Sequence, residues 1–150
     1  MYENILVPLD GSEPAEAALP HATQLAKAVG ARVTLLMVIQ PISVYPQPGM
    51  VGPVVSVSMN LEDEEEQGRQ YLDRIVKRLE LEGVDAGSVV KKGDPASEIC
   101  DHAQENNIDL IVMSTHGRSG IRRWVYGSVA ERVLRGANVP VLLVRAKPGE

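Results

Sequence analysis

The sequence has little of what secreted, zinc-binding and membrane-spanning proteins depend on. It contains a single cysteine, Cys100, which excludes an intrachain disulfide framework and a zinc site built from several cysteines. No apolar run approaches the roughly 20 residues that a bilayer-spanning helix needs. No basic segment followed by a long apolar one opens the chain. We therefore expect a soluble, cytoplasmic protein with no membrane contact.

Aromatic residues are also scarce, at 3% of the chain, and phenylalanine is absent. The core must therefore be aliphatic. The formal net charge of -5 argues against nucleic acid or an anionic membrane as the main partner. The length of 150 residues fits a single domain, residues 1–150, which can bury about two-thirds of its unfolded surface.

Several well-known catalytic and ligand-binding signatures are missing. There is no G-x-x-x-x-G-K-[ST] phosphate loop, and the first predicted strand is followed by Asp10-Gly11-Ser12 instead of G-x-G-x-x-G. The motifs H-E-x-x-H and G-x-S-x-G are absent too. His21 and His102 fall on predicted helices, where we expect them at the surface or its boundary. Cys100 lies on an apolar helical face, which favours a small buried hydrophobe over a nucleophile.

What the sequence does contain is a regular alternation of apolar strands and amphipathic helices. The strands are mostly non-alternating apolar runs, typical of a sheet buried on both faces. They are predicted at 4–10, 32–38, 88–92, 109–113 and 139–145. Helices are predicted between them, at 13–29, 60–83, from Asp94 to about 103, and at 128–136. Pro20 should kink the first helix.

This alternation predicts an α/β fold with a doubly wound, five-stranded parallel sheet of the Rossmann-like type. In the strand order 3-2-1-4-5, right-handed crossovers place the first and fourth strands side by side. The loops that follow them then converge at the switch point, where such sheets bind ligands. Asp10 should therefore face the 114–128 segment.

The segment at about 40–60 is predicted to be a long irregular loop. Four of the ten prolines lie within it, and it leaves the carboxyl end of the second strand. A lid over the ligand edge and a disordered segment are both compatible with this composition. The acidic run 62–66 that follows is best explained by carboxylates stabilising a helix N-terminus. A patch for a metal or a basic partner is the less favoured alternative.

Residues 113–128 combine the features of a phosphate cradle. Glycines permit a close backbone approach, arginines supply donors and positive charge, and the following helix offers free N–H groups. These residues are Gly117, Gly120, Gly127, Arg118, Arg122 and Arg123. The alternative is a turn-rich crossover with solvated arginines.

Three side chains near this edge each have two interpretations. Ser128 opens an S-x-x-E capping box, and its hydroxyl could also hold a phosphate oxygen. Asp10 is either a turn-forming residue or an acceptor for ribose hydroxyls, with Mg²⁺ bound to the phosphates as a further partner. His116 could contact the ligand or stabilise a turn. Trp124 is expected to anchor the loop more than to stack on a base.

The last predicted strand, Val139–Arg145, is largely aliphatic and lies at an edge in this strand order. An open apolar edge is an aggregation template, so we expect it to pair with its own copy in a homodimer. The alternative is that the tail, residues 146–150, folds back over it.

Taken together, these segments resemble the universal stress protein family over essentially the whole chain. The ATP-binding branch of that family carries G-x-x-G, nine residues, then G-[ST]. Here Gly117 is the second glycine, Gly127-Ser128 closes the motif, and Ser114 replaces the first glycine. That replacement adds a Cβ where the backbone could approach the ligand. The segments that carry the resemblance are Ile5–Ser12, Leu35–Val38, Gly93–Pro95, Asp109–Gly120, Gly127–Val133 and Val139–Val144.

The resemblance implies a homodimer built on the last strand and ATP, with Mg²⁺, held between the ends of strands one and four. Pro8 and Asp10 would lie at the adenosine side, with Asp10 near the ribose, and the backbone of Val38 would meet the adenine. The remaining implied residues are Met113, which lines the pocket, and, around the phosphates, Ser114, Thr115, His116, Gly117, Arg118, Ser119, Gly120, Gly127, Ser128, Val129 and Ala130.

Two classes of function remain open at this point, a nucleotide-binding regulatory protein and an ATP-hydrolysing enzyme on a related fold. A related ATP pyrophosphatase would resemble S-G-G-x-D-S after the first strand, and Asp10-Gly11-Ser12-Glu13 does not. No paired acid and base stands out in the central loop. A binding protein, with any hydrolysis slow and incidental, is therefore favoured. A dimeric stress protein with an empty site is the weaker third alternative.

Overall fold

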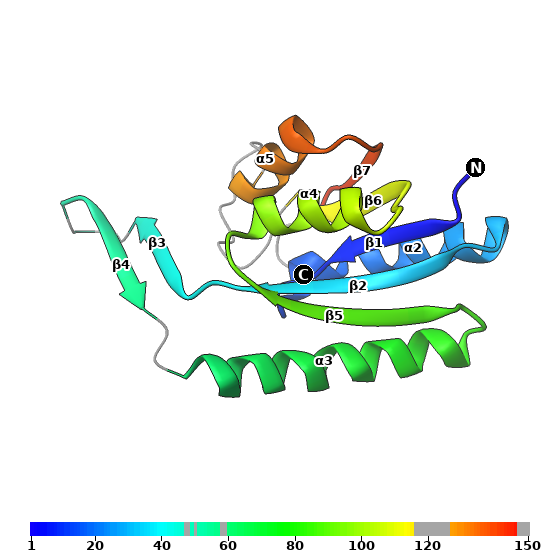
Figure 1. Ribbon diagram of the computed structural model, residues 1–150, viewed down its shortest axis with the longest axis horizontal. Helices are drawn as coiled ribbons and strands as arrows, with labels where there is room; N and C mark the ends of the chain where they lie inside the picture. The colour runs from blue at the N-terminus through cyan, green and yellow to red at the C-terminus, as the bar shows by residue number, and fades with distance from the viewer. Residues whose placement is uncertain (47–48, 50, 58–59, 116–126, 147–150) are drawn as a thin grey trace.

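The computed structural model describes residues 1–46, 49, 51–57, 60–115 and 127–146, with the backbone alone for 42–46 and 53–57. Its main sheet contains β1 (Asn4–Pro8), β2 (Arg32–Ile39), β5 (Ala86–Lys92), β6 (Leu110–Ser114) and β7 (Val141–Val144). All neighbouring pairs are parallel, in the order β5-β2-β1-β6-β7 (Figure 1). Counted along the chain, this order is 3-2-1-4-5, so the predicted fold is confirmed.

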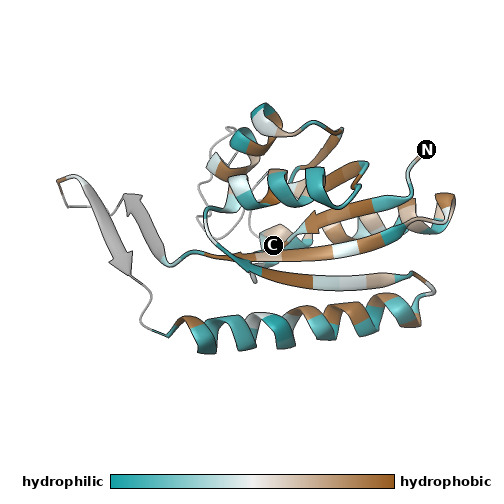
Figure 2. Ribbon diagram, viewed as in Figure 1, coloured by the Kyte–Doolittle hydropathy of each residue, from teal (hydrophilic) through white to brown (hydrophobic). Residues whose placement is uncertain are grey.

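Helices cover both faces of this sheet. Successive strand residues point to opposite sides, and because both sets of side chains are apolar, each face must be buried. Ile5 and Val7 of β1 belong to one buried cluster, whereas Leu6 between them belongs to the other. The first cluster lies under α1 (Glu13–Glu16), α2 (Ala18–Val29) and α3 (Leu61–Leu81). The second lies under α4 (Pro95–Glu105) and α5 (Ser128–Gly136). Figure 2 shows hydrophobic residues along much of β1 and β2, and helices α3 and α4 in which hydrophilic and hydrophobic residues are interspersed.

The predicted first helix is divided into α1 and α2 at Ala17. Pro20 explains the break, because a proline inside a helix lacks the N–H that would bond to the carbonyl four residues earlier, here Glu16. The expected kink is therefore a full interruption, and α1 is left as a single turn directly after the Asp10 segment.

The prediction of an irregular loop at about 40–60 is wrong. The segment contains an antiparallel hairpin, β3 (Ile42–Pro46) and β4 (Pro53–Val57), which projects beyond the end of β2 (Figure 1). Its β-branched residues favour strands. The prolines that argued against strands occupy the paired ends, Pro46 opposite Pro53, where a missing N–H is tolerated.

Candidate functional site

The residues predicted for the base and ribose end of the site lie at the carboxyl edge of three adjacent strands. Pro8 is the last residue of β1 and pairs with Leu36 of β2. Val38 is near the end of β2 and is partly exposed. Met113 is the second-last residue of β6. Strand β6 pairs with β1 on the side opposite β2. The sheet order thus brings these three positions to one edge, as predicted. The side chain of Met113, 5% exposed, packs in the second core cluster.

Asp10 stands in a tight turn between β1 and α1. Its Oδ1 accepts hydrogen bonds from the backbone N–H of Ser12, at 3.0 Å, and from the Ser12 hydroxyl. The same hydroxyl oxygen accepts from the N–H of Ala15, at 3.4 Å, and so caps α1. Gly11 between them has φ +88°, a conformation that side chains rarely adopt. The turn-forming role of Asp10 is therefore confirmed, and the turn fixes its half-buried carboxylate at the sheet edge.

The end of β6 is tied to the start of α5. Ser114 and Thr115 are buried, at 6% and 7% exposure. The N–H of Thr115 donates to the carbonyl oxygen of Val144 on β7, at 2.9 Å. The carbonyl oxygen of Thr115 accepts from the N–H of Gly127, at 2.6 Å. The two ends of the predicted phosphate loop therefore meet at one hydrogen bond.

The capping box predicted for Ser128 is wrong. Gly127 is the N-cap of α5, and Ser128 is the first helical residue, with an exposed side chain. The N–H of Glu131 donates to the carbonyl oxygen of Gly127, at 3.0 Å, as the first helical turn requires. Gly127 has no side chain to offer as a cap. Val129 is half-buried and Ala130 is buried.

The remaining predicted residues lie outside the described part of the chain. His116, Gly117, Arg118, Ser119 and Gly120 fall within residues 116–126, as do the other two arginines and the tryptophan of that segment. Their assignment to the phosphates stays a prediction from the sequence.

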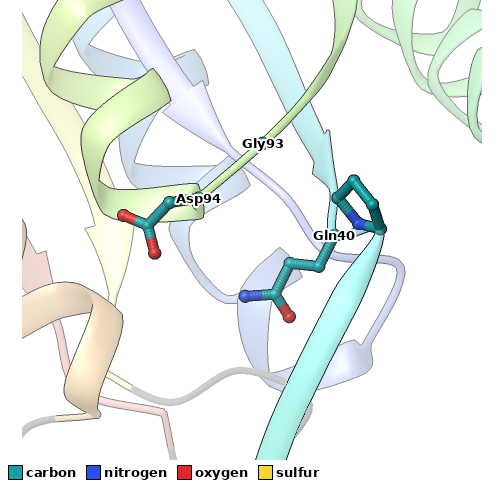
Figure 3. Close-up of a pocket in the computed structure, with 4 residues that line it drawn as sticks. Gln40, Gly93 and Asp94 are labelled. Atoms are coloured by element: carbon teal, nitrogen blue, oxygen red, sulfur yellow. The ribbon is translucent and has the colours of Figure 1, made fainter. Parts of the chain in front are cut away.

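A cavity of about 220 Å³ opens at the ends of β2 and β5. It is lined by Gln40, Pro41, Gly93 and Asp94, which Figure 3 shows on the segments that follow the two strands. The N–H of Gly93 donates to the carbonyl oxygen of Ile39, at 3.0 Å, and holds the two segments together. Sequence reasoning did not single out these four residues. The available signal was that the second and third strands are neighbours in the predicted order, so the residues that follow them had to meet.

Asp94 has two structural partners besides the cavity. As the N-cap of α4 it accepts from the N–H and the hydroxyl of Ser97, at 3.1 and 2.8 Å. It also forms a bidentate ion pair with Arg132 on α5, with Nη–Oδ distances of 2.9 and 2.8 Å. The hydrogen bonds from Arg132 are the main reason that the pKa of Asp94 is lowered to about 2. The carboxylate therefore stays ionised down to strongly acidic pH.

The two candidate nucleophile or acid–base side chains outside this edge have structural roles. His102 was predicted at the surface or its boundary, which is wrong, since it is 5% exposed and its Nδ1 lies 3.2 Å from Nδ2 of Asn106. His102 lies beside the buried residues Ile99 and Ala103 of α4. The buried face of that helix therefore includes a polar residue that the apolar pattern did not indicate. Cys100 packs against the second core cluster, and burial raises the pKa of its thiol. A raised pKa disfavours the reactive thiolate.

Within the described part of the chain, no group of three or more histidine, cysteine, aspartate or glutamate side chains could hold a metal ion. None of the described helices combines the length and the apolar character needed to cross a bilayer.

The chain matches the family model described as the universal stress protein family over residues 1–145. Universal stress protein MJ0531 of Methanocaldococcus jannaschii is 37% identical over 147 residues, covering 97% of this chain and 83% of the relative. Universal stress protein YxiE of Bacillus subtilis is 33% identical over 150 residues, covering 97% of this chain and 100% of the relative.

Solved structures match the same fold. The structure of MJ0577, whose study was a structure-based assignment of biochemical function, superposes with a TM-score of 0.78 at 29% identity, over 99% of each chain. Universal stress protein UspA from Lactobacillus plantarum superposes with a TM-score of 0.79 at 26% identity, over 96% of this chain and 98% of the other.

Two more distant structures share the fold and were solved as complexes. A universal stress protein in complex with cAMP superposes with a TM-score of 0.71 at 21% identity, over 97% of this chain and 98% of the other. One from Archaeoglobus fulgidus in complex with dAMP superposes with a TM-score of 0.67 at 24% identity, over 95% and 97%. Family model, curated relatives and fold agree over nearly the whole length, and this chain belongs to the universal stress protein family.

Proposed function

We propose that this protein binds ATP at the carboxyl edge of its sheet and acts as a cytoplasmic regulatory protein. The observation that carries the proposal is the convergence of three elements at the switch point between β1 and β6. These are the Asp10 turn after β1, the end of β6 at Thr115, and the first turn of α5 after Gly127. Open α/β sheets bind ligands at such a crevice, and a helix N-terminus there favours an anion.

The parts of an adenine nucleotide can be assigned along this edge. The adenine would occupy the side of Pro8, Val38 and Met113, near the cavity at the ends of β2 and β5. Asp10 would accept from the ribose hydroxyls. The phosphates would lie among residues 114–120 and 127–130. The cAMP and dAMP complexes on the same fold support an adenine nucleotide as the ligand class.

Mg²⁺ would enter this site with the nucleotide. Phosphate oxygens supply most of the ligands that Mg²⁺ keeps when it binds ATP, and proteins commonly add only one or two carboxylates. Asp10 is the candidate carboxylate on this chain. We propose binding and signalling rather than turnover, because no candidate nucleophile or paired acid and base stands out in the sequence of the central loop.

Isothermal titration with Mg-ATP, ADP, AMP, cAMP and adenosine tests the proposal, after mass spectrometry of natively purified protein for co-purified nucleotide. Arg118→Ala should weaken ATP by about tenfold or more and leave adenosine unchanged, because a guanidinium–phosphate hydrogen bond is charge-assisted. Asp10→Asn should weaken both ligands, and Mg-ATP more than adenosine, since asparagine preserves the turn while the ribose acceptor and the candidate Mg²⁺ ligand both change. Gly117→Val should abolish binding through its branched Cβ.

The binding results for these variants and for the wild type test the assignment of each residue to the ligand. A folded Gly117→Val variant with wild-type ATP affinity would contradict the assigned loop. Equal losses of ATP and adenosine in Arg118→Ala would mean that this arginine is a solvated loop residue. A wild-type protein that binds none of the five ligands would leave the empty-site alternative as the correct one.

We further propose that the protein is a homodimer through β7. This strand lies at an edge of the sheet, with β6 as its neighbour, and Leu142 is 37% exposed. Pairing with the same strand of a second copy about a two-fold axis would run antiparallel and occupy the open edge.

A further inference from the structure

The ion pair between Asp94 and Arg132 connects the two ends of the proposed nucleotide site. Asp94 lines the cavity at the ends of β2 and β5, on the base side. Arg132 lies on α5 one helical turn after Ser128, on the phosphate side. The pair is bidentate: Nη1 of Arg132 donates to Oδ1 of Asp94 at 2.9 Å, and Nη2 donates to Oδ2 at 2.8 Å. A fork of this kind fixes orientation as well as distance.

On the base side the pair rests on a rigid support. The N–H of Gly93 is bonded to Ile39 of β2, so the residue before Asp94 is fixed to the sheet. The carboxylate of Asp94 is also held by the N–H and hydroxyl of Ser97 in the first turn of α4. Arg132 is therefore bound by an acceptor that has little freedom to move.

On the phosphate side, α5 packs on the second core cluster through apolar side chains. Of its nine residues, Ala130 and Val133 are buried, and Val129 packs against the same cluster. The backbone bond from Gly127 to Thr115 fixes its first end. Of the two ion pairs that α5 makes in the described part of the chain, Arg135–Glu131 is internal to the helix, and Arg132–Asp94 joins it to the start of α4. Apolar packing holds the helix on the sheet, and the bidentate pair of Arg132 adds a directional contact that fixes its orientation more tightly.

We propose that the Asp94–Arg132 pair is a positioning device for the polyphosphate, which sets the N–H groups of the first turn of α5 at a fixed place relative to the base cavity. This inference rests on the proposed function. Arg132 acts here through Asp94 and α5 and does not contact the ligand. Preorganised donors bind an anion better than mobile ones, because the entropic cost of ordering them is not subtracted from the binding free energy. Loss of Arg132, which lies away from the base cavity, should therefore weaken ATP and leave adenosine, which lacks phosphates, unaffected.

Four variants test this role by titration with Mg-ATP and adenosine. Arg132→Met removes the guanidinium, Asp94→Asn removes the carboxylate charge and keeps an N-cap acceptor, and the double variant combines them. Arg135→Met is the control, because it removes one positive charge from the same helix and breaks only an internal pair. We expect each single variant of the pair to weaken ATP about two- to fivefold, as is typical of an exposed ion pair. The double variant should be no weaker than either single one, and Arg135→Met should match the wild type.

Asp94→Asn separates positioning from direct contact. If Arg132 bound the phosphates itself, releasing it from Asp94 would preserve or improve ATP affinity, and that result would overturn the proposal. An equal loss of adenosine affinity in Arg132→Met would overturn it too, because the pair would then support the whole site and not the phosphate end.

Amide hydrogen exchange without nucleotide provides a second, ligand-independent test. Exchange along α5 should be faster in both single variants of the pair and unchanged along α2. Unchanged exchange in α5 would overturn the positioning role alone. A wild-type protein that binds no adenine nucleotide would instead overturn the proposed function, and with it any role in phosphate binding.

Discussion

The hydroxyl of Tyr71 on α3 donates a 2.8 Å hydrogen bond to Oε2 of Glu16 on α1. This contact joins the long helix that follows the hairpin to the single turn that follows Asp10. Tyr71 also packs against the first core cluster, so its ring is partly buried and its hydroxyl is directed at a carboxylate. The short α1, cut off by the break at Ala17, is thereby attached to the body of the protein.

Tyr71→Phe should lower the free energy of unfolding by about 1 kcal/mol at pH 7, the usual net value of a hydrogen bond. Burial, and then the bond to Glu16, raise the pKa of Tyr71 above its ordinary value of 10.0. A raised pKa contributes stability that is present below the ordinary value and is lost as the pH rises past it. The difference between wild type and variant should therefore shrink above pH 10, as measured by urea unfolding. Parallel curves for the two proteins from pH 7 to pH 11 would contradict this.

Asp94→Asn should show the opposite pH dependence. The pKa of Asp94 is lowered from 3.8 to about 2, so its contribution is present above pH 3.8 and is lost as the pH falls toward 2. The carboxylate is 42% exposed, and after discounting for solvent screening we expect a loss of about 1 kcal/mol at pH 7. Denaturant unfolding at pH 7 and below pH 2 measures the difference, which should vanish only below the folded pKa. A difference of unchanged size below pH 2 would show that the charge of Asp94 is not its source.

Gly11→Ala should destabilise the protein by about 1 kcal/mol, because φ is +88° at this position. It should also weaken adenosine, since the strained turn carries Asp10. Gly83→Ala is the control, with φ +89°, open space around the added Cβ and a position beyond the end of α3. Both variants should lose similar stability in thermal melts, while only the first changes affinity. Equal adenosine affinity in the two variants would show that the Asp10 turn does not contribute to ligand binding.

The fold was predictable because its strands are continuous apolar runs, such as Ile5–Val7 and Leu110–Val112, whose burial on both faces leaves few alternative arrangements. The hairpin was not, since Pro46 and Pro53 obscured a strand pattern that tolerates them at its ends. The cap at Gly127 was missed because Ser128 followed by Glu131 fits a capping box equally well by spacing.

For the candidate site, the sequence predicted the positions of residues that directly follow a single strand. Asp10 and Thr115 follow predicted strands, so the sheet order located them. The cavity at Gln40 and Asp94, and the pair with Arg132, depend on how α4 and α5 pack on one face. Contacts between residues so far apart in the sequence leave no local pattern.

Leu143→Pro should convert the proposed homodimer to a monomer, because it removes a backbone donor that faces the open edge of β7. The carbonyl oxygens of Pro140 and Val144 accept hydrogen bonds from the β6 side, so the backbone of the residues between them alternates and that of Leu143 faces away from β6. Leu143→Lys tests the side-chain face of the same strand separately. Sedimentation velocity at micromolar concentration measures the outcome, with Leu134→Lys, an exposed apolar residue on α5, as the control that should stay dimeric. A monomeric wild type, or two β7 variants that both remain dimeric, would place the interface elsewhere.

The hydrogen bond between Gly127 and Thr115 joins the two ends of the eleven-residue segment that lies between them in the sequence. The anchors of that segment are fixed by β7 and by α5, and neither bond uses a side chain. The entropy of closing a loop rises only slowly with its length. A change in the length of the segment 116–126 would therefore leave both of these backbone anchors in place.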